Sequence, residues 1–557
     1  MRKRILGIVT GFVAAAFMLT ACSVPFDKVD KSNVSGEQAK KNKDDVMDRG
    51  PVKGGTLKLF STSPDTLNPL FTNNIYVKDF LGFVFEGLVK LDKKLGPVPV
   101  LAKDWEASED GLTWTFHMKQ NVFWHDNIPF TSEDVEFTVE TILKQNTNSV
   151  YRKNLENITS FAAVDKYTFR IMLKNRNSFT AELMTFPVIP KHCFIGEDVV
   201  RSEKNMKPVG TGPFRFSSYT QKEEVKLVLN DKWWGSANSD PSLPSLPYIA
   251  EIQVRIFEEG KDAVNAFHTV DIDAAMMNGA DSAKYKGRQD LIMKKYPGRN
   301  YEFLAFNLTK PVFQSKAVRQ AIAYAVDRVR IVNDILPGQA VVTDIPIIPN
   351  SWINDSSYEF YTPNKDKARE LLTQDGWKNS SYGLYKYVNG VYTSLNLEIL
   401  VNEDNETRLK LAHSIAEQLN EVGIKLQVKK VNWDNTLQLL NSKQYDIALL
   451  GCQISITPDL TFLYGSWNSA PQGGNVYNAS GYNNSVVDNL LAQILAENDT
   501  SKRKALFSEC KKVIMDELPY LGLYLQNESM LYNKRIRGEI NPDIMNRYSD
   551  ITRWYLP

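Results

Sequence analysis

The sequence predicts an α/β protein with more than one domain, and two observations carry this prediction. Segments with the two-residue alternation of strands and segments with the helical spacing of apolar residues follow one another along the chain. The chain has 557 residues, of which 43% are hydrophobic and 24% charged, a composition typical of a soluble globular protein. A body of this length exceeds one hydrophobic core and should divide into two or three domains.

The chain opens with the pattern of a secretory signal peptide. A basic cluster at 2–4 precedes an apolar run over 5–19, which is shorter than the roughly 20 apolar residues that a membrane span needs. Leu19-Thr20-Ala21-Cys22 then resembles the bacterial lipobox, in which the Cys thiol receives a diacylglycerol. The resemblance implies a signal peptide over 1–21, a lipidated Cys22, and a place on the outer face of the cytoplasmic membrane. An ordinary cleavage site with a chance Cys is the alternative.

Residues 22–53 are predicted to form a flexible tether. The segment is polar and charged and has almost no apolar periodicity, so it cannot bury enough apolar surface to offset the entropy of ordering. A coil of about 30 residues spans roughly 30 Å. This length would hold a globular body just off a membrane.

The first part of the body shows strand and helix patterns in order. A glycine pair opens a predicted strand over 54–60, and 76–88 has apolar residues at helical spacing. Residues 105–119 alternate around the turn Asp110-Gly111, which predicts a hairpin. Residues 131–134 combine hydroxyls with acids, as the start of a helix does.

The second part continues this alternation of elements. Residues 313–336 and 408–422 have the spacing of amphipathic helices, and 424–431 alternates as a strand. Residues 445–450 read as a buried strand that runs into Gly451. The order of helices and strands through the body therefore favours an α/β fold.

Charge and cysteine usage argue against several classes of protein. The formal net charge of +1 gives no electrostatic case for binding nucleic acid or an anionic membrane surface. Cysteines other than Cys22 are widely spaced and form no CxxC motif, so neither a zinc site nor a full disulfide framework is expected. They are Cys193, Cys452 and Cys510. Buried free thiols are the expectation, and one disulfide pair among them stays open.

Catalytic motifs are missing from the sequence. It contains no GxSxG elbow, P-loop, HExxH or Rossmann glycine fingerprint. None of the five histidines pairs with another at metal-ligand spacing; they are His117, His125, His192, His268 and His413. Trp124-His125-Asp126 offers a histidine–carboxylate pair, although a surface turn explains it better. We therefore expect no enzyme, no cofactor and no metal. The 11% of aromatic residues suits the binding of a solute.

Five segments of the body, taken in order, resemble one protein family. They are 101–105 with 108–116, then 122–135, 209–214, 317–322 and the pair Asp327-Arg328. In sequence and order they are similar to the solute-binding proteins of oligopeptide, dipeptide and nickel ABC importers. The resemblance runs from about Gly54 to the C-terminus.

This resemblance implies a two-lobed, hinged fold like that of periplasmic binding proteins, with an additional domain inserted in lobe I. The implied parts are lobe I over 54–96, 205–305 and 526–557, the extra domain over 97–204, and lobe II over 306–525. The chain would cross between the lobes near 305 and near 525, and these crossings would form a hinge that closes on a ligand.

The resemblance also implies where a ligand binds. In peptide-binding members, the loop after a buried strand lines the cleft and its backbone pairs with the peptide as an added strand. The expected contact residues of this loop are Gly451, Cys452, Gln453, Ser455 and Asp459. Gly451 matches the family's glycine, and Cys452 stands where a Trp is frequent. Members often carry an Asp four residues after the glycine, which pairs with the ligand's α-ammonium, but this sequence has Ser455. Either Asp459 or another acid substitutes, or the ligand lacks a free N-terminus there.

The opposite wall of the cleft would come from the loop over 67–75. There the resemblance implies that Asn73, Asn74 and Ile75 face the backbone of the ligand. Tyr151 and Trp433 align with aromatic cleft residues, and a structural role is equally open for each.

The predicted function is that of a lipid-anchored substrate-binding protein of an ABC importer. It would act as a monomer, capture peptides between two closing lobes, and deliver them to a permease driven by ATPase subunits. One alternative is a receptor of the same fold for a metal chelate or another solute, or a peptide sensor. An extracytoplasmic enzyme is the other alternative, and the missing motifs disfavour it.

Overall fold

The computed structural model describes most of the chain beyond its N-terminal segment. The described residues are 50–262, 266–267, 269, 272–277, 284–285, 287–355, 361–388, 390–468 and 478–557. They belong to one compact unit, Arg49–Pro557. The predicted signal peptide, Cys22 and nearly all of the predicted tether lie outside the described residues, so these features remain predictions. Among the described residues, no helix has both the length and the apolar character needed to cross a membrane.

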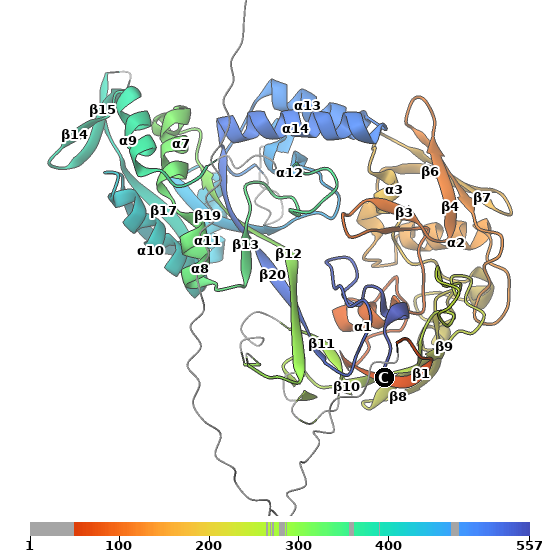
Figure 1. The fold of residues 1–557 in the computed structure, drawn as a ribbon. Coiled ribbons are helices and arrows are strands. Elements are labelled where there is room, and N and C mark those ends of the chain that lie inside the picture. The colour runs from red at the N-terminus through yellow and green to blue at the C-terminus, as the bar shows by residue number, and fades with distance from the viewer. Residues whose placement is uncertain are drawn as a thin grey trace, which may run out of the picture. The chain divides into compact units, whose positions relative to one another are not determined.

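A sheet of 11 strands runs through this unit (Figure 1). Its order is β18-β17-β19-β12-β20-β11-β1-β10-β9-β8, and β13 pairs with β20 beside this path. The strands are β1 (Gly54–Thr62), β8 (Phe214–Thr220), β9 (Glu224–Leu229), β10 (Ile249–Phe257), β11 (Ala274–Met277), β12 (Leu291–Phe306), β13 (Ala340–Val342), β17 (Asn396–Asn402), β18 (Lys425–Val431), β19 (Ile447–Gln453) and β20 (Tyr520–Asn533).

The two longest strands, β12 and β20, connect the two halves of this sheet. They pair antiparallel from Leu291–Asn533 at one end to Ala305–Tyr520 at the other. β11 joins the pair at the first end and β19 at the second. The register shifts between Pro297 and Tyr301, and irregularities of this kind bend a strand. The pair therefore carries its bend between the two halves, in the stretch that Figure 1 shows as adjacent green and blue arrows.

Two large apolar cores pack against the two halves of the sheet. One core is built mainly from residues between 301 and 525, and the other mainly from residues between 57 and 254 together with residues between 530 and 554. Leu91, Leu95 and Phe179 come from the N-terminal third of the chain but pack in the first core. Each buried Leu or Phe side chain contributes about 1.5–3 kcal/mol to stability relative to its exposed state.

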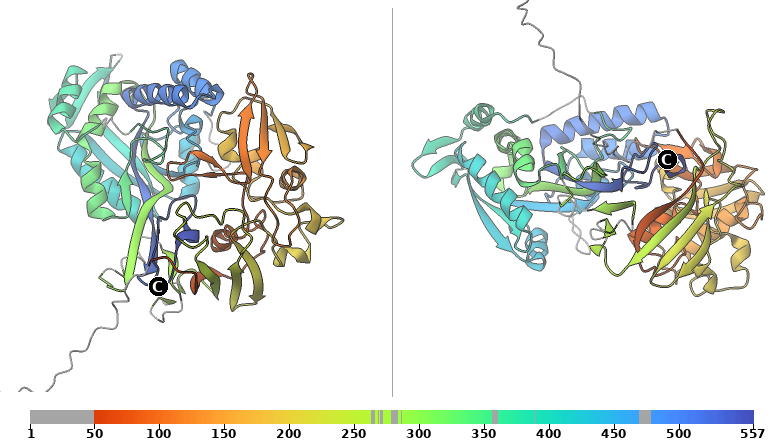
Figure 2. Two further views of the ribbon diagram at one scale, coloured as in Figure 1. Left: turned by 45° about the vertical axis from the view of Figure 1, so that its right-hand side comes forward. Right: turned by 60° about the horizontal axis from the view of Figure 1, so that its bottom comes forward.

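A separate sheet of four strands has the order β4-β5-β7-β6. The strands are β4 (Ala102–Ala107), β5 (Thr113–Met118), β6 (Ile158–Asp165) and β7 (Thr168–Leu173). Drawn in orange to yellow, they stand apart from the long sheet in Figure 2. The β4–β5 pair confirms the predicted hairpin, since the amide of Ser108 donates to the carbonyl of Thr113 across the turn. Gly111 has φ +66° in this turn, a conformation that favours glycine.

Helix α2 (Ser132–Leu143) follows this hairpin and begins where the sequence predicts. Thr131 and Asp134 form a capping box, in which the Thr131 amide donates to Asp134 Oδ2 at 2.9 Å. The apolar residues Val135, Val139 and Ile142 recur on one face of the helix and are buried. Local sequence chemistry therefore explains both where this helix starts and which face it buries.

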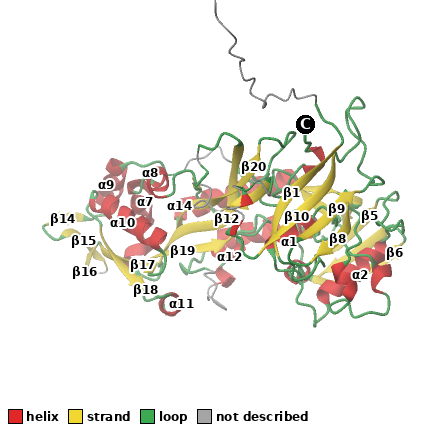
Figure 3. Cartoon of the chain, turned by 90° about the horizontal axis from the view of Figure 1, so that it is seen from below, coloured by secondary structure: helices red, strands yellow, loops and turns green. Residues whose placement is uncertain are grey.

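Most remaining helices accompany the C-terminal half of the sheet, as the red elements near β17 and β18 show in Figure 3. They are α6 (Pro311–Gln314), α7 (Lys316–Ala325), α8 (Arg328–Ile335), α9 (Lys365–Gln374), α10 (Glu406–Asn420), α11 (Trp433–Asn441), α12 (Thr461–Tyr464), α13 (Ser485–Ala496) and α14 (Thr500–Glu517). A small sheet pairs β14 (Lys378–Ser380), β15 (Gly383–Val388) and β16 (Val391–Ser394), and β2 (Val89–Leu91) pairs with β3 (Pro97–Pro99).

Two predicted helices differ from those in the structure. The continuous helix predicted over 313–336 is wrong, because Ser315 and Val326 have extended backbone and divide it into α6, α7 and α8. Asp327 then starts α8 by accepting a hydrogen bond from the Arg330 amide. The helix predicted over 76–88 is α1 (Ile75–Leu81), which ends at Gly82. In both cases the apolar spacing continues beyond the end of the helix.

The cysteines within the described chain are free thiols. Cys510 is buried, as expected, whereas Cys193 and Cys452 are half-buried. The expectation of buried thiols therefore holds fully for Cys510 alone.

Candidate ligand-binding site

Asp65 organises the loop that leads to the predicted cleft residues Asn73, Asn74 and Ile75. Its carboxylate accepts hydrogen bonds from the Thr72 hydroxyl and from the Asn73 amide, the latter at 2.9 Å. Burial by itself would raise the pKa of Asp65, but the hydrogen bonds from Thr72 and the backbone amides hold it below the ordinary value. The carboxylate therefore fixes the backbone at Asn73, whose side chain remains exposed.

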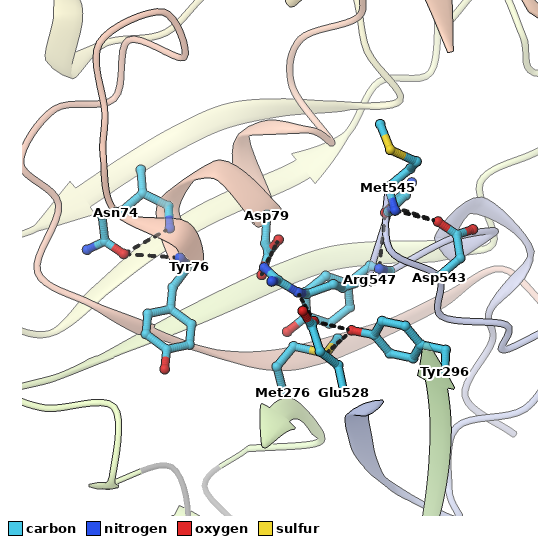
Figure 4. Close-up of polar contacts among 12 residues, drawn as sticks. Asn74, Tyr76, Asp79, Met276, Tyr296, Glu528, Asp543, Met545 and Arg547 are labelled. Atoms are coloured by element: carbon cyan, nitrogen blue, oxygen red, sulfur yellow. Dashed lines mark hydrogen bonds and ion pairs between the residues drawn. The ribbon is translucent and has the colours of Figure 1, made fainter. Parts of the chain in front are cut away.

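The side chain of Asn74 is committed to the fold. Its Oδ1 accepts from the amides of Tyr76 and Val77 and caps α1, as Figure 4 shows. Its Nδ2 donates to Thr62 Oγ1 at 2.8 Å and to the Ser63 carbonyl. A ligand would have to displace one of these bonds to reach the amide of Asn74. Next to it, the side chain of Ile75 is 46% exposed and is free of this network.

The strand end at β19 is held by the neighbouring strand β12. Cys452 lies opposite Tyr301, and Gln453 lies opposite Asn300. One residue further, the Ile454 amide donates to the Arg299 carbonyl at 2.9 Å, and Arg299 Nε donates back to the Ile454 carbonyl at 2.7 Å. Arg299 therefore extends the pairing beyond the strand.

One edge of β19 has no partner strand over much of its length. β17 pairs with β19 only at Ile447 and Ala448. In the part of the chain that the structure describes, residues 449–453 therefore have β12 on one side and no strand on the other. Unpaired N–H and C=O groups at such an edge can pair with an added strand.

Gly451 lies directly against a partly buried ion pair that the sequence did not reveal. Arg408 Nε and Nη2 donate to Glu302 Oε2 and Oε1, each at 2.8 Å. A Cβ atom on residue 451 would stand 2.2 Å from Glu302 Oε1 and 2.4 Å from Arg408 Nη2. Burial raises the pKa of Glu302, and the guanidinium of Arg408 opposes that rise. Only glycine leaves room for this bidentate pair.

The two polar candidates after β19 have different neighbours. The hydroxyl of Ser455 is exposed and lies 2.8 Å from the hydroxyl of Thr457. Asp459 is half-buried, and its Oδ1 accepts from the Thr461 amide at 2.8 Å at the start of α12. Among the described residues, Oδ2 of Asp459 has no hydrogen-bond donor. Asp459 therefore keeps one carboxylate oxygen available for a cation.

The aromatic candidates Tyr151 and Trp433 pack against different cores. Tyr151 is partly buried against the core that contains β1, and burial raises the pKa of its hydroxyl to about 12. Trp433 is the first residue of α11 and packs partly buried against the core that contains β19. Both therefore have structural contacts in addition to any role at a ligand.

A second polar cluster that the sequence did not reveal surrounds Arg547 (Figure 4). Arg547 Nη1 lies 3.3 Å from Asp79 Oδ1 of α1, and its Nε lies 3.2 Å from Glu528 Oε2 of β20. The hydroxyl of Tyr296 on β12 donates to the same Glu528 oxygen at 3.0 Å. Burial raises the pKa of Asp79 to about 6, although Arg547 opposes the rise. The cluster ties α1 and the C-terminal segment to both long strands.

Sequence signals could not have located either ion pair. Arg408 and Glu302 are 106 residues apart, and Arg547 and Asp79 are 468 residues apart. No local spacing links such partners, because the fold alone brings them together.

Comparisons with known proteins show which family the chain is similar to. A profile described as "Bacterial extracellular solute-binding proteins, family 5 Middle" matches residues 96–474. The oligopeptide-binding protein AppA of Bacillus subtilis (strain 168) is 25% identical over 569 residues, covering 100% of this chain and 99% of AppA.

Two solved structures share the fold. The ABC transporter substrate-binding protein CtaP of Listeria monocytogenes is 25% identical with a TM-score of 0.70, covering 90% of this chain and 99% of CtaP. The murein tripeptide-binding protein MppA in its unliganded open form has a TM-score of 0.76 at 20% identity, covering 91% of this chain and 99% of MppA. The predicted two-lobed α/β fold is thereby confirmed.

Proposed function

Because the chain belongs to the bacterial extracellular solute-binding proteins of family 5, we propose that it is the substrate-binding protein of an ABC importer for peptides. It captures an oligopeptide between its lobes and delivers it, unchanged, to a permease driven by ATPase subunits. A ligand that binds the closed form more tightly than the open form shifts the population toward the closed form. Proteins of this family bind substrates for transporters and are not enzymes.

In this proposal the lobes have the boundaries predicted from the sequence. Lobe I spans 54–96, 205–305 and 526–557, the extra domain spans 97–204, and lobe II spans 306–525. Support comes from the two apolar cores and from β12 and β20, which both cores share. We place the hinge at the crossings near 305 and 525, and the register shift between Pro297 and Tyr301, where Tyr301 lies opposite Leu525, supports a bend next to them.

The free edge of residues 449–453 is the observation that carries the peptide assignment. An extended peptide can add to this edge as a further strand, with Arg299 holding the loop beyond it in place. Gly451, Cys452 and Gln453 supply backbone groups, and Asn73 and Ile75 contribute from the opposite wall. Asp459 accepts the peptide's α-ammonium through its free oxygen in place of an acid at Ser455. Tyr151 and Trp433 contact ligand side chains.

Peptide capture by the refolded full chain tests this proposal. Unfolding releases any bound ligand, and the refolded protein is then mixed with a pool of tri- to hexapeptides of mixed sequence or with the N-acetylated form of the same pool. We expect retained peptides from the first pool, and at least about tenfold weaker retention of acetylated ones, because a hydrogen bond to a charged group contributes about 1.5–3 kcal/mol. Mass spectrometry identifies the retained peptides.

Asp459→Asn separates the ammonium contact from the peptide assignment. This variant should lose the preference for free amines, whereas Asp434→Asn, an exposed acid on α11, should keep it. Equal retention of both pools by the parent chain would remove the role of Asp459 and leave peptide binding standing. Retention of neither pool would contradict the peptide assignment itself.

A metal chelate or another non-peptide solute is the second candidate ligand, and peptide sensing is a second use of the same site. The exposed hydroxyl of Ser455, which is paired with the buried hydroxyl of Thr457, favours this candidate, since it offers a neutral donor where peptide binders often carry an acid. Calorimetry with nickel–histidine against the peptide pool decides, because a chelate signal beside peptide silence would reverse the ranking.

The proposed location is the outer face of the cytoplasmic membrane, with a monomeric protein anchored by lipid on Cys22 and tethered by residues 22–53. Cys22→Ala should release the protein into the periplasm or the medium. Retention of this variant in the membrane fraction would contradict the anchor and leave the binding function untouched.

A further inference from the structure

Asp126, His192 and Cys193 bring three different metal-ligand atoms together outside the candidate cleft. Asp126 lies in the loop between β5 and α2, and the other two lie in the 3-10 helix Lys191–Phe194. Their ligand atoms all lie within 4.8 Å of one another, and His192 Nε2 is 2.7 Å from Asp126 Oδ2. We propose that these three side chains bind one divalent cation of the zinc class.

Neighbouring residues hold both the loop that carries Asp126 and the 3-10 helix that carries His192 and Cys193. The Lys191 amide donates to Asp134 Oδ1 at 2.9 Å, which ties the 3-10 helix to the start of α2. The ring of Trp124 lies edge-on to the ring of His192, with centroids 6.2 Å apart. Oδ1 of Asp126 accepts from the Ile128 amide, so Oδ2 is the oxygen turned toward His192. Such outer contacts orient the ligands of metal sites.

The geometry is close to that of a tetrahedral zinc site. Zinc bonds of roughly 2.0–2.3 Å place neighbouring ligand atoms about 3–4 Å apart, so shifts of about 1 Å suffice to close this cluster on an ion. The His192 and Asp126 side chains are 27% and 37% exposed, which leaves room for these shifts and for a water as fourth ligand. A nitrogen, oxygen and sulfur donor set suits Zn²⁺ or Co²⁺ better than Mg²⁺ or Ca²⁺.

The charges around the cluster also permit a cation. Two lysines lie near the cluster in the described chain, and both are paired: the ammonium of Lys204 is bound to Glu197 at 2.7 Å and to the Cys193 carbonyl at 2.6 Å, and that of Lys191 to Glu133 at 2.8 Å. On binding, the Cys193 thiol loses its proton to solvent, and the proton of His192 moves to Nδ1 so that Nε2 can coordinate.

The sequence does not reveal this site, because its ligands lack a recognisable spacing. Asp126 and His192 are 66 residues apart, and His192 is adjacent to Cys193. A cavity of about 180 Å³ borders Cys193 on another side and is lined also by Leu67, Asn68 and Phe194. A bound ion would therefore cross-link two segments next to the loop that leads to Asn73.

Titration of the full chain with Co²⁺, after chelator treatment, tests the proposal. We expect one equivalent to bind, with a near-ultraviolet thiolate-to-cobalt band and visible bands of tetrahedral intensity, and Zn²⁺ to displace both. Cys193→Ser should abolish the near-ultraviolet band and weaken binding at least about tenfold. Asp126→Asn should weaken binding and keep the band. Zn²⁺ should raise the melting temperature of the parent chain and leave that of Cys193→Ser unchanged.

Matched variants keep this test falsifiable. Cys452→Ser removes another half-buried thiol, and His413→Ala removes an exposed imidazole, so both should bind Co²⁺ as the parent chain does. Far-ultraviolet circular dichroism in chelator checks that each variant folds. A near-ultraviolet band that survives Cys193→Ser, or no saturable binding in the parent chain, overturns the proposal. Peptide capture is measured separately and does not depend on this result.

Discussion

The two ends of the β12–β20 pair each carry a partly buried arginine, but they differ in charge balance. At the β19 end, Arg408 meets Glu302 alone through two bonds of 2.8 Å. At the β11 end, Arg547 lies between the two carboxylates of Asp79 and Glu528. The first group is neutral, whereas the second has one excess negative charge when both acids are ionised.

This difference determines what each end responds to. The folded-state pKa of Asp79, about 6, lies above its ordinary value of 3.8. The folded chain therefore binds an extra proton between these two values, and the contribution of Asp79 to stability falls as the pH rises through that window. We expect the β11 end to respond to pH. The raised pKa of Glu302 gives the β19 end a smaller response in the same direction, and this end should respond mainly to the fit of side chains at Gly451.

Breaking the pair at the β19 end should have the largest effect. Arg408→Met leaves the partly buried Glu302 carboxylate without its partner, which costs at most about 3–5 kcal/mol. The double variant Glu302→Gln with Arg408→Met should recover part of this loss, because no buried charge remains. Urea unfolding measures both. If the double variant lost as much stability as Arg408→Met, the ion pair would not be the reason.

The β11 end should show its difference through pH. Relative to Asp79→Asn, the wild type should gain roughly 2–3 kcal/mol of stability as the pH falls from 7 to 4, since a shift of one pKa unit corresponds to 1.36 kcal/mol. Urea unfolding across this range measures the gap between the two chains. Asp366→Asn, whose acid is 95% exposed, is the matched control and should show no such trend. A gap that stays constant with pH would remove the contrast between the two ends.

A methyl group added at residue 451 tests how closely the backbone of β19 packs against the Glu302–Arg408 pair. Gly451→Ala would place Cβ against Glu302 Oε1 and should cost about 1–3 kcal/mol through overpacking. The cost should shrink in a Glu302→Ala background, which removes the atom that Cβ meets. A double-mutant cycle by urea unfolding gives the coupling. Zero coupling would show that Gly451 is not tied to the ion pair.

Arg503, a buried arginine outside both clusters, should show the smallest effect. The guanidinium of Arg503 lies between the rings of Phe179 and Trp352, at 4.9 and 4.8 Å, and donates to the Ser178 carbonyl. Arg503→Lys keeps the charge but loses the flat stacking, so we expect a loss of about 1 kcal/mol in thermal or urea unfolding. A loss as large as that of Arg408→Met would contradict the small contribution that we assign to stacking of the guanidinium.

Local chemistry explains the parts of the fold that the sequence predicts well. The hairpin around Gly111, the capping box at Thr131 and the strand β18 depend on residues a few positions apart. The prediction of one helix over 313–336 is wrong because apolar spacing alone does not show where the backbone leaves the helical conformation. Its apolar spacing is continuous, but the extended backbone at Ser315 and Val326 interrupts it.

The candidate site could be predicted only in part. Family resemblance pointed to the loop after β19, but the groups that hold that loop were missed. Arg299 and Glu302 come from β12, and Arg408 comes from α10. The helix-capping role of Asn74 was missed as well, because an asparagine before an apolar segment is also typical of a loop that faces a ligand. Contacts between distant segments leave no periodic trace in the sequence.

The central claim is that a peptide pairs with the free edge of β19, and backbone amide exchange tests it most directly. With a bound peptide from the mixed pool, we predict slower exchange at those alternate amides of residues 449–453 that face away from β12, and in the following loop to Asp459, because the added strand accepts their hydrogen bonds. Exchange at β9, far along the sheet, should stay unchanged. Peptide binding that leaves the exchange at 449–453 unaltered would contradict the account.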